Sequence, residues 1–506
     1  MQADADGAGV MLNLWSGWDC ESAGQRGSGE ANGRGGIMSK TEYLTTSVLA
    51  KARTAKIRTR RNDVMQSLST LSRVFMYSLF SAGSNARGQL GNGSTDDSHS
   101  FQLCSFFGCP PGTLPTGSVR VISVSGGANH TALLLEIKDT FSSKLRTELW
   151  GSGSSSRGQL GPDIYAFPNA SSPVFRLIYL PLEQHNLAGY SYKIARAAWE
   201  TTYAVLSSPG KEDVLISMGA DDFGDLGVGD HSNMNTFHTV NFDHVKVDGL
   251  TLKSDTIEIL DLSTGQHHVV AHLRATFSDD SARSFVVGWG ISRHGQLGDA
   301  ALDSEHNVMQ RFIPTPRLVL GAEEITELSL GAQHTIFLHA SRRVSGIGSN
   351  RKGQLSKLES LSQVRHVACA WNGTYIVVDD EVGAWRILSL GSNTHGQLGR
   401  ISSDGIDSLD EAVVDFPDTV KAWNLERIVC GSEHVLCVTS AKTGTLEQHK
   451  TEVWGWGWNE HGNLGLSTTD DAHAPVKLWP AKYGDPYNII DIWAGCGTSW
   501  LYALSS

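Results

Sequence analysis

The sequence predicts an all-β protein built as a seven-bladed β-propeller, and two interleaved repeat patterns lead to this prediction. The first is a turn of the form Gly-Gln-Leu-Gly or a close variant, whose first glycine stands at Gly88, Gly158, Gly224, Gly295, Gly353, Gly396 and Gly462. The second joins a β-branched run to a Gly-x-x-His turn and an apolar run, as in Val121–Leu135. Short runs of this kind, separated by glycine turns, are typical of β-strands.

The spacing of the seven turns, from 43 to 71 residues, is that of one propeller blade per repeat. Closing seven blades into a ring leaves no long sheet edge exposed. We therefore expect the strand Tyr77–Ala82 to pair with Trp500–Leu504 and close the ring. A helical solenoid is excluded, because the chain has 54 glycines and no 3.6-residue periodicity.

Each repeat contains two further expected structural features. The Leu of the turn is expected to pack between sheets, and its Gln or Asn to cap the turn by hydrogen bonds to the backbone. Equivalent histidines stand at His130, His268, His334 and His434, and Thr201, Gly373 and Thr498 replace them elsewhere. We interpret these histidines as structural, each bonded to the glycine-turn backbone of its own blade. Metal or proton chemistry is the alternative, but a shared ring would not lack three of its seven members.

The first 75 residues differ from the rest. Residues 1–36 are rich in Gly, Ala and Ser without hydrophobic periodicity, which predicts disorder. Six basic side chains follow within Lys51–Arg61. We predict a disordered, basic extension over 1–75 and a propeller over 76–506. The basic run is either a localisation or nucleic-acid arm, or a solvated tail, or sequence upstream of a natural start at Met76.

Composition restricts the function classes. The chain has 41 basic and 53 acidic residues, a net charge of −12, which disfavours direct binding to nucleic acid. No apolar stretch approaches the roughly 18 residues of a membrane span. Seven cysteines are odd in number and sparse, which favours free thiols, and the chain lacks a signal-peptide pattern. We expect a protein of the cytoplasm and nucleus.

Sequence signals for catalysis are negative. The chain has no Cys-x-x-Cys zinc knuckle, no phosphate-binding Gly-x-x-x-x-Gly-Lys-Ser/Thr loop, and no supported Gly-x-Ser-x-Gly elbow. We therefore expect no enzyme, no cofactor and no metal site.

The predicted contact residues for a partner are mostly tryptophans. Trp199 and Trp371 each stand two residues before a position where the repeat histidine is replaced, and exposed tryptophans often anchor interfaces. Trp454, Trp456 and Trp458 alternate with other residues and should share one side of a strand, either as a core layer or as a binding platform. The full predicted set is Trp199, Glu200, Trp371, Trp454, Trp456, Trp458, Glu460 and Trp500.

The third repeat is acidic where other repeats are basic. Its carboxylates are Asp221, Asp222, Asp225 and Asp230. A calcium loop would need Asp-x-Asp-x-Asp spacing, which is absent. We predict a solvated acidic rim that steers a basic partner surface.

The repeat signature resembles the regulator-of-chromosome-condensation repeat family over essentially all of residues 76–506. Three features are similar to the fungal alpha-tubulin suppressor group and, more distantly, to secretion-regulating guanine nucleotide exchange factors. They are Ala198–Thr202, then Gly431–His434 followed by Trp454–Gly462, and the ending Gly495–Leu501.

This resemblance implies a non-enzymatic adaptor that binds a small zinc-binding protein. The pair would support Elongator-dependent modification of wobble uridines in transfer RNA and diphthamide synthesis on elongation factor 2. The alternative implied by the founding family member is a guanine nucleotide exchange factor for a small GTPase. Exchange needs an inserted wedge, for which Lys138–Thr147 and Ala275–Arg283 are the short insertions of suitable character.

Overall fold

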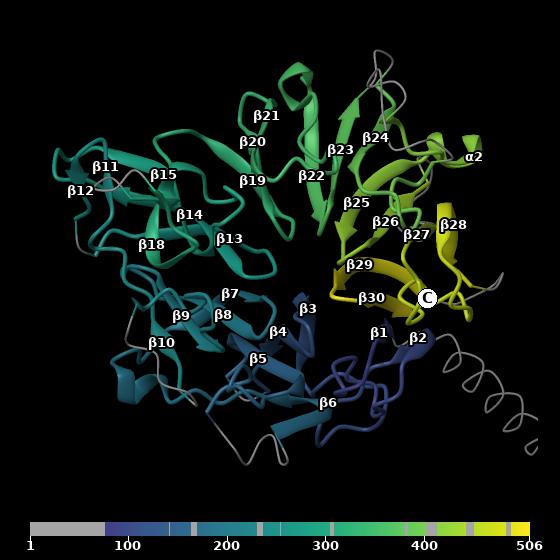
Figure 1. The fold of residues 1–506 in the computed structure, drawn as a ribbon. Helices are drawn as coiled ribbons and strands as arrows, with labels where there is room; N and C mark the ends of the chain where they lie inside the picture. Colours follow the sequence, from purple (N-terminus) through teal and green to yellow (C-terminus); the bar gives the residue numbers. More distant parts are fainter. Residues whose placement is uncertain are drawn as a thin grey trace, which may run out of the picture. The chain divides into compact units, whose positions relative to one another are not determined.

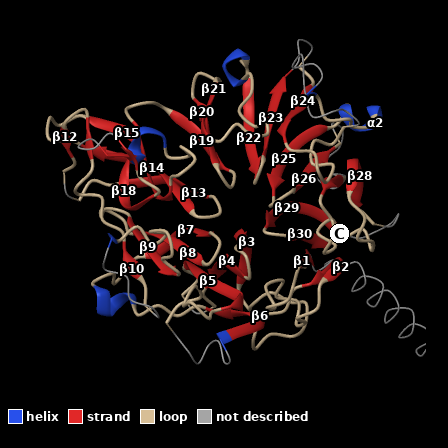
Figure 2. Cartoon of the chain, in the orientation of Figure 1, coloured by secondary structure: helices blue, strands red, loops and turns tan. Residues whose placement is uncertain are grey.

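The computed structural model describes residues 76–140, 142–162, 170–229, 236–253, 255–303, 308–379, 383–400, 412–441, 450–481 and 487–505. The extension predicted over residues 1–75 lies outside these ranges. Within them, nearly all regular structure is β-strand (Figure 2). The short helical turns are η2 (Leu182–His185), η4 (Gly298–Ala301), η5 (Leu358–Ser360) and α2 (Asp418–Lys421).

Seven antiparallel sheets stand around a common axis, which confirms the predicted seven-bladed propeller (Figure 1). From the axis outward, blade 1 contains β29 (Tyr487–Gly495), β30 (Thr498–Ser505), β1 (Tyr77–Gly83) and β2 (Ser98–Leu103). Blade 2 contains β3 (Ser118–Gly126), β4 (His130–Lys138), β5 (Leu145–Ser154) and β6 (Ser171–Leu177). Blade 3 contains β7 (Ser191–Ala197), β8 (Thr201–Ser207), β9 (Val214–Gly219) and β10 (His238–Thr239).

The ring continues with blade 4, which contains β13 (Glu258–Thr264), β14 (His268–Thr276), β15 (Ala282–Ile291) and β18 (Phe312–Leu320). Blades 5 and 6 each have three strands in the described residues: β19 (Ile325–Leu330), β20 (His334–His339) and β21 (Val344–Gly348), then β22 (Val364–Ala370), β23 (Gly373–Asp379) and β24 (Trp385–Gly391). Blade 7 contains β25 (Asn424–Cys430), β26 (His434–Ser440), β27 (Thr451–Gly457) and β28 (Ala472–Trp479).

Two small hairpins lie outside the blades. They pair β11 (Lys246–Val247) with β12 (Leu250–Thr251) and β16 (Leu302–Asp303) with β17 (Val308–Met309).

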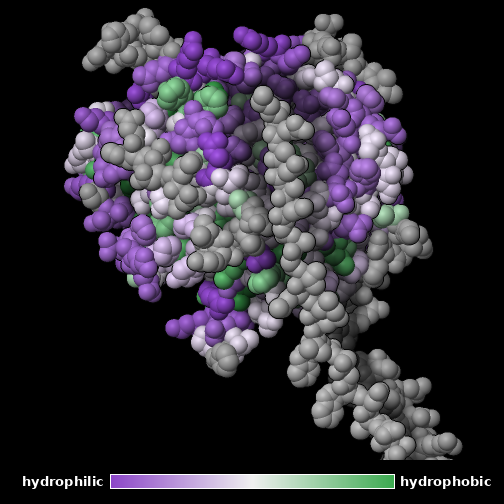
Figure 3. All heavy atoms as spheres, turned by 60° about the horizontal axis from the view of Figure 1, so that its bottom comes forward, coloured by the Kyte–Doolittle hydropathy of each residue, from purple (hydrophilic) through white to green (hydrophobic). Residues whose placement is uncertain are grey.

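The lower side of the ring in Figure 1 is mainly hydrophilic, with hydrophobic side chains in scattered small groups (Figure 3).

The two ends of the ring meet in blade 1. Strand β1 pairs antiparallel with β30 along its whole length, from Tyr77 opposite Leu504 to Gly83 opposite Thr498. The expected closure by the first and last strands is therefore confirmed. Because those strands are separated by the whole propeller sequence, the ring closes only when nearly all of the chain has folded.

The glycine turns behave as the sequence predicts. In blade 1, the side chain of Asn85 accepts a hydrogen bond from the backbone of Leu90, and that of Gln89 accepts one from the backbone of Arg87. The turn leucine Leu90 is fully buried, and its counterpart Leu398 is 2% exposed. Gly88 has a positive φ of 80°, and a Cβ there would lie 2.5 Å from the backbone of Pro173. The turn thus requires glycine at this position.

The repeat histidines connect neighbouring blades, so the expected bond to their own turn backbone is wrong. His130 Nε2 lies 2.9 Å from Thr202 Oγ1, a hydroxyl of the next blade. The same contact recurs, at 3.0–3.2 Å, from His268 to Thr335, from His334 to Thr374 and from His434 to Ser499. The expected glycine contact is a packing contact instead, because a Cβ on Gly127 would lie 2.4 Å from Cε1 of His130. The histidines therefore have a structural role, as expected, but each bonds to a hydroxyl group of the next blade.

Blades without the histidine use aromatic side chains at the same junction. In blade 3 the hydroxyl of Tyr203 donates to the carbonyl of Asp225, and Trp289 Nε1 of blade 4 donates to that same carbonyl at 2.8 Å. In blade 6 the carbonyl of Gln397 accepts from Tyr375 and from Trp456 of blade 7. At the blade 1 junction, Trp500 occupies the equivalent position and packs on Gly126 of blade 2.

The third strand of each blade carries a small residue opposite these side chains of the second strand. The residue two positions after each histidine is aliphatic and pairs with a glycine, such as Ala132 with Gly151. Where an aromatic stands there, it pairs with a serine: Tyr203 with Ser217, Tyr375 with Ser389 and Trp500 with Ser81. The seven junctions therefore fall into four histidine seams and three aromatic seams.

The histidine seams predict a loss of stability in mild acid. Burial lowers the pKa of His130 and His268 to about 3 and that of His334 and His434 to about 4. The unfolded chain, with an ordinary histidine pKa near 6.5, binds protons below that pH that the folded chain does not. We expect the free energy of unfolding to fall between pH 6.5 and pH 4 by up to about 1.4 kcal/mol per pH unit and histidine.

Urea unfolding of the full chain at pH 7.5 and pH 5.5 measures this dependence. His434→Ala should lower stability at pH 7.5 by about 1–3 kcal/mol, because it removes a buried side chain and its hydrogen bond to Ser499, which keeps only its bond to the carbonyl of Asn463. The variant should also weaken the pH dependence. His461→Ala, which changes an exposed histidine paired with Asp97, is the control. A stability that does not change between the two pH values would contradict the seam assignment.

Candidate functional site

The blade topology gives the ring two different faces. In each blade, the loop from the inner to the second strand and the glycine turn after the third strand emerge on the same side, which we call the Gly-turn face. The two kinds of loop also touch, since the backbone of Trp458 in the blade 7 turn donates to the carbonyl of Glu433 at 2.9 Å. The turns between second and third strands lie on the opposite side, the hairpin face. Both insertions considered as exchange wedges, Lys138–Thr147 and Ala275–Arg283, contain such hairpin-face turns.

An axial channel runs between the inner strands. A wider part of about 440 Å³ and a narrower part of about 130 Å³ share lining residues, among them Ser125, Thr264 and Leu330. The narrower part opens on the Gly-turn face and is lined by loops of all seven blades. We call this opening the axial mouth.

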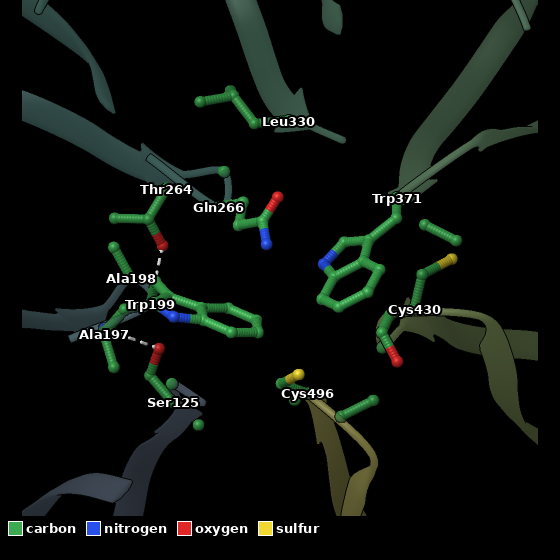
Figure 4. A pocket seen from close by; sticks show the side chains of 18 of the residues that line it. Ser125, Ala197, Ala198, Trp199, Thr264, Gln266, Leu330, Trp371, Cys430 and Cys496 are labelled. Atoms are coloured by element: carbon green, nitrogen blue, oxygen red, sulfur yellow. Dashed lines mark hydrogen bonds between the residues drawn. The ribbon is translucent and has the colours of Figure 1, made fainter. Parts of the chain in front are cut away.

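Trp199 and Trp371 meet at the axial mouth. They come from blades 3 and 6, and their ring centroids lie 5.8 Å apart at an interplanar angle of 45°. Figure 4 shows the two indoles facing each other, with Gln266 and Cys496 beside them. Both side chains are half-buried, so part of each indole faces solvent. The structure therefore brings together two residues that the sequence could relate only by their equivalent repeat positions.

Backbone hydrogen bonds hold both tryptophans in place. Trp199 accepts from Ala128 of blade 2 at 2.8 Å and donates to Gln266 of blade 4 at 3.1 Å. Trp371 accepts from Ala332 of blade 5 at 3.0 Å and donates to Ser432 of blade 7 at 2.7 Å. Since each is tied to both neighbouring blades, the pair is preorganised by the ring.

Glu200 belongs to an ion cluster beside Trp199. Arg157 of blade 2 pairs with Asp222 at 2.8 Å and lies 3.8 Å from Glu200, both in blade 3. The hydrogen bond from Arg157 to Asp222 raises the pKa of that guanidinium. Because the cluster has two carboxylates and one guanidinium, this edge of the axial mouth is net acidic.

The acidic rim predicted for the third repeat is smaller than expected. The side chain of Asp222 is 50% exposed, but that of Asp225 is 4% exposed and pairs with His267 at 3.2 Å. Asp221 accepts a hydrogen bond from the backbone of Leu226 inside the turn, and Asp230 lies outside the described residues. Two of the three described carboxylates therefore have structural roles.

Two aromatic contact residues were not anticipated. His267 stacks obliquely near Trp199, with ring centroids 6.0 Å apart, and Phe223 lies 4.9 Å from His267. Phe223 is 37% exposed. Its signal was present in the sequence, because it replaces the Arg, His or Lys that other repeats carry before the turn glycine. The aromatic surface thus extends from the axial mouth toward blade 3.

Trp458 and Glu460 lie on the same face in blade 7. Trp458 is half-buried, and its Nε1 lies 3.3 Å from Glu460. Its ring contacts His461 at 5.2 Å and His395 at 6.3 Å between centroids. Five predicted contact residues, Trp199, Glu200, Trp371, Trp458 and Glu460, are therefore on the Gly-turn face.

The other three predicted contact residues lie in the core instead. Trp456 and Trp500 are fully buried, and Trp454 is 8% exposed. Trp454 and Trp456 share one side of β27, as expected, and both contact the ring of Phe416. The core alternative is correct for Trp454 and Trp456, whose side chains pack between blades 6 and 7, and Trp500 packs in the core between blades 1 and 2.

The hairpin-face part of the channel is polar and internally paired. Arg196 donates to the carbonyl of Leu262 at 2.9 Å and lies 3.7 Å from Asp261. Burial lowers the pKa of Arg196, and Asp261 opposes that shift. Across the channel, Arg427 pairs with Asp491. These charges neutralise each other.

Within the described ranges, no group of three or more His, Cys, Asp or Glu side chains is placed to hold a metal ion. No helix found in the same residues is long and apolar enough to span a membrane. The six described cysteines are free thiols, as predicted. Burial raises the pKa of Cys369 to about 12, so this channel thiol stays protonated near neutral pH.

The fold and the site define a repeat propeller with aromatic side chains grouped around its axial mouth. A family model of the regulator of chromosome condensation (RCC1) repeat matches residues 78–134 and 451–501, which include most of β1 and the first half of β30, the two strands that close the ring. This match and the relatives below, which align over most of the chain, support a resemblance to the RCC1 repeat family.

Two curated relatives are similar over most of the chain. The secretion-regulating guanine nucleotide exchange factor of Bos taurus is 24% identical over 454 residues, which cover 84% of this chain and 82% of that protein. The ultraviolet-B receptor of Arabidopsis thaliana is 25% identical over 407 residues, or 78% of this chain and 76% of that receptor.

The solved structures support the fold. Prp20p from Saccharomyces cerevisiae has a TM-score of 0.60 at 18% identity, covering 86% of this chain and 92% of its own. Human WBSCR16 has a TM-score of 0.57 at 15% identity, and the match covers 84% of this chain and 98% of WBSCR16.

The different burial of the blade 7 tryptophans predicts different costs of removing them. Trp456→Ala should lower the free energy of unfolding by about 3–5 kcal/mol, because it leaves a cavity between blades 6 and 7. Trp458→Ala, two residues away, should cost at most about 1 kcal/mol, because its side chain is partly solvated. Urea unfolding of both variants at pH 7.5 measures the costs, and equal losses would contradict the assignment of one residue to the core and the other to the surface.

Proposed function

We propose that this protein is a guanine nucleotide exchange factor that binds a small GTPase through its Gly-turn face. The observation that carries the proposal is the similarity to the secretion-regulating guanine nucleotide exchange factors, which extends over 84% of this chain and 82% of the bovine protein. Exchange makes and breaks no covalent bond, so the proposal needs no catalytic residue or cofactor in this chain.

The chemistry of the axial mouth is suited to such a partner. Preorganised tryptophans bury a large area at small cost in side-chain entropy, which makes Trp199 and Trp371 suitable anchors. The carboxylates of Glu200 and Asp222 repel nucleotide phosphates and attract the basic side chain that phosphates leave behind. If this protein binds the nucleotide-free GTPase more tightly than the nucleotide-bound GTPase, then its binding lowers the affinity of the GTPase for nucleotide by the same factor.

The test is release of a fluorescent GDP analogue from a panel of purified small GTPases, with and without the full 506-residue chain. We expect one GTPase to release nucleotide at least about tenfold faster. The double variant Trp199→Ala, Trp371→Ala should lose most of this acceleration, because the anchors are gone. Tyr179→Ala, which removes a 66% exposed side chain that follows the outer strand β6 and lies outside both insertions considered as wedges, is the matched control.

A second candidate is the adaptor implied by the resemblance to the fungal alpha-tubulin suppressor group. The half-exposed pair Trp199 and Trp371 favours it equally, since such a pair also suits a stable protein partner. This adaptor would work in the cytoplasm and nucleus, with the small zinc protein of diphthamide synthesis and Elongator-dependent tRNA modification. Affinity purification distinguishes the two: a stoichiometric small zinc protein supports the adaptor, and a GTPase retained only without nucleotide supports exchange.

A further inference from the structure

Among the described residues, the basic side chains of the glycine turns pair with acids in blades 2, 6 and 7 and make no ion pair in blades 1, 4 and 5, of which blades 4 and 5 are neighbours. Three of these side chains contact a carboxylate at 2.7–2.9 Å: Arg157 in blade 2, His395 in blade 6 and His461 in blade 7. The corresponding positions of blades 4 and 5 hold Arg293, His294, Arg351 and Lys352. We call these four residues the cationic ridge.

No member of the cationic ridge makes an ion pair within the described part of the chain. Arg293 Nε donates to His294 Nε2 at 3.1 Å, so its neighbour is a ring nitrogen and not a carboxylate. Arg293, Arg351 and Lys352 are exposed. Asp299, which follows the blade 4 turn, also lies beyond ion-pair distance of all four.

The two turns that carry the ridge are adjacent. A Cβ on Gly348, directly before the blade 5 turn, would lie 3.1 Å from the Cα of Gln296 in the blade 4 turn. The positive charges of Arg293 and Arg351 also contribute, after burial, to lowering the pKa of His294. The positive charges of the ridge, on Arg293, Arg351 and Lys352, thus lie on two adjacent turns, and His294 is the neutral acceptor beside Arg293.

A polar hollow adjoins the ridge on its blade 6 side. It has a volume of about 380 Å³ and is lined by Arg351, Lys352, Gly353, Gly391, Ser392, Asn393 and Thr394. Hydroxyl groups and cations at the rim of a hollow suit an ionised carboxylate, whose oxygens accept hydrogen bonds and donate none.

We propose that the cationic ridge binds an acidic segment of the protein that docks on Trp199 and Trp371. The chain as a whole has a net charge of −12, so these described cations without an acidic partner form a local region of opposite sign. Such a region attracts acidic side chains of a partner. The ridge lies on the Gly-turn face, as does the acidic cluster of Glu200 and Asp222 on the blade 3 edge of the axial mouth. Opposite charges at separate places on one face fix the orientation of the docked partner as well as its position.

This inference rests on the proposed function only for the identity of the partner. Binding itself is measured with the full chain and a fluorescein-labelled peptide of ten glutamates, by fluorescence anisotropy at low salt, with a ten-glutamine peptide for comparison. We expect the glutamate peptide alone to bind, and its affinity to fall steeply as NaCl is added.

The triple variant Arg293→Glu, Arg351→Glu, Lys352→Glu should bind the glutamate peptide at least about tenfold more weakly. Arg87→Glu is the matched control, because Arg87 is a single exposed, unpaired cation at the same turn position in blade 1, and it should change the affinity less than about twofold. Circular dichroism checks that both variants fold.

Equal losses of peptide affinity in the triple variant and in the control would overturn the proposal. Complete displacement of the peptide by inorganic phosphate at equal concentration would also overturn it, because it would indicate a phosphate site. Failure of the exchange assay with intact peptide binding would remove the proposed function and leave the ridge. Exchange that persists while the peptide does not bind would remove the ridge and leave the proposed function.

Discussion

The pairing of β1 with β30 is the constraint on which the rest of this structure depends. It joins residues from the two ends of the propeller sequence in one sheet. The axial mouth exists only because the ring is closed: Trp199 and Trp371 come from blades that are not neighbours, and each is held by the blades on both sides. A surface assembled in this way depends on the closed ring to hold its two tryptophans in place.

The seven-bladed ring, its closing strands and the design of the glycine turns could be predicted from the sequence, because each depends on a local pattern that recurs. The direction of the histidine contacts could not. A repeat shows what its own residues are, but His130 bonds to Thr202 of the next blade, and only the relative placement of two sheets reveals that partner. Local pattern specifies the blade and says little about the seam.

The candidate site was partly predictable for the same reason. Trp199 and Trp371 were recognisable because they occupy equivalent repeat positions, yet their contact across the axis follows from the geometry of the closed ring. Trp456 and Trp458 have the same spacing pattern and opposite environments, because β27 ends between them at Gly457. Where a strand ends decides which of two similar residues is available to a partner.

The unequal seams also divide the ring into sectors. Aromatic seams join blade 1 to 2, blade 3 to 4 and blade 6 to 7, and these contacts contain no group that titrates in mild acid. Histidine seams separate those pairs and isolate blade 5 on both sides. The residue chosen at one position of each repeat thus decides which seams carry a buried imidazole and lose stability in mild acid.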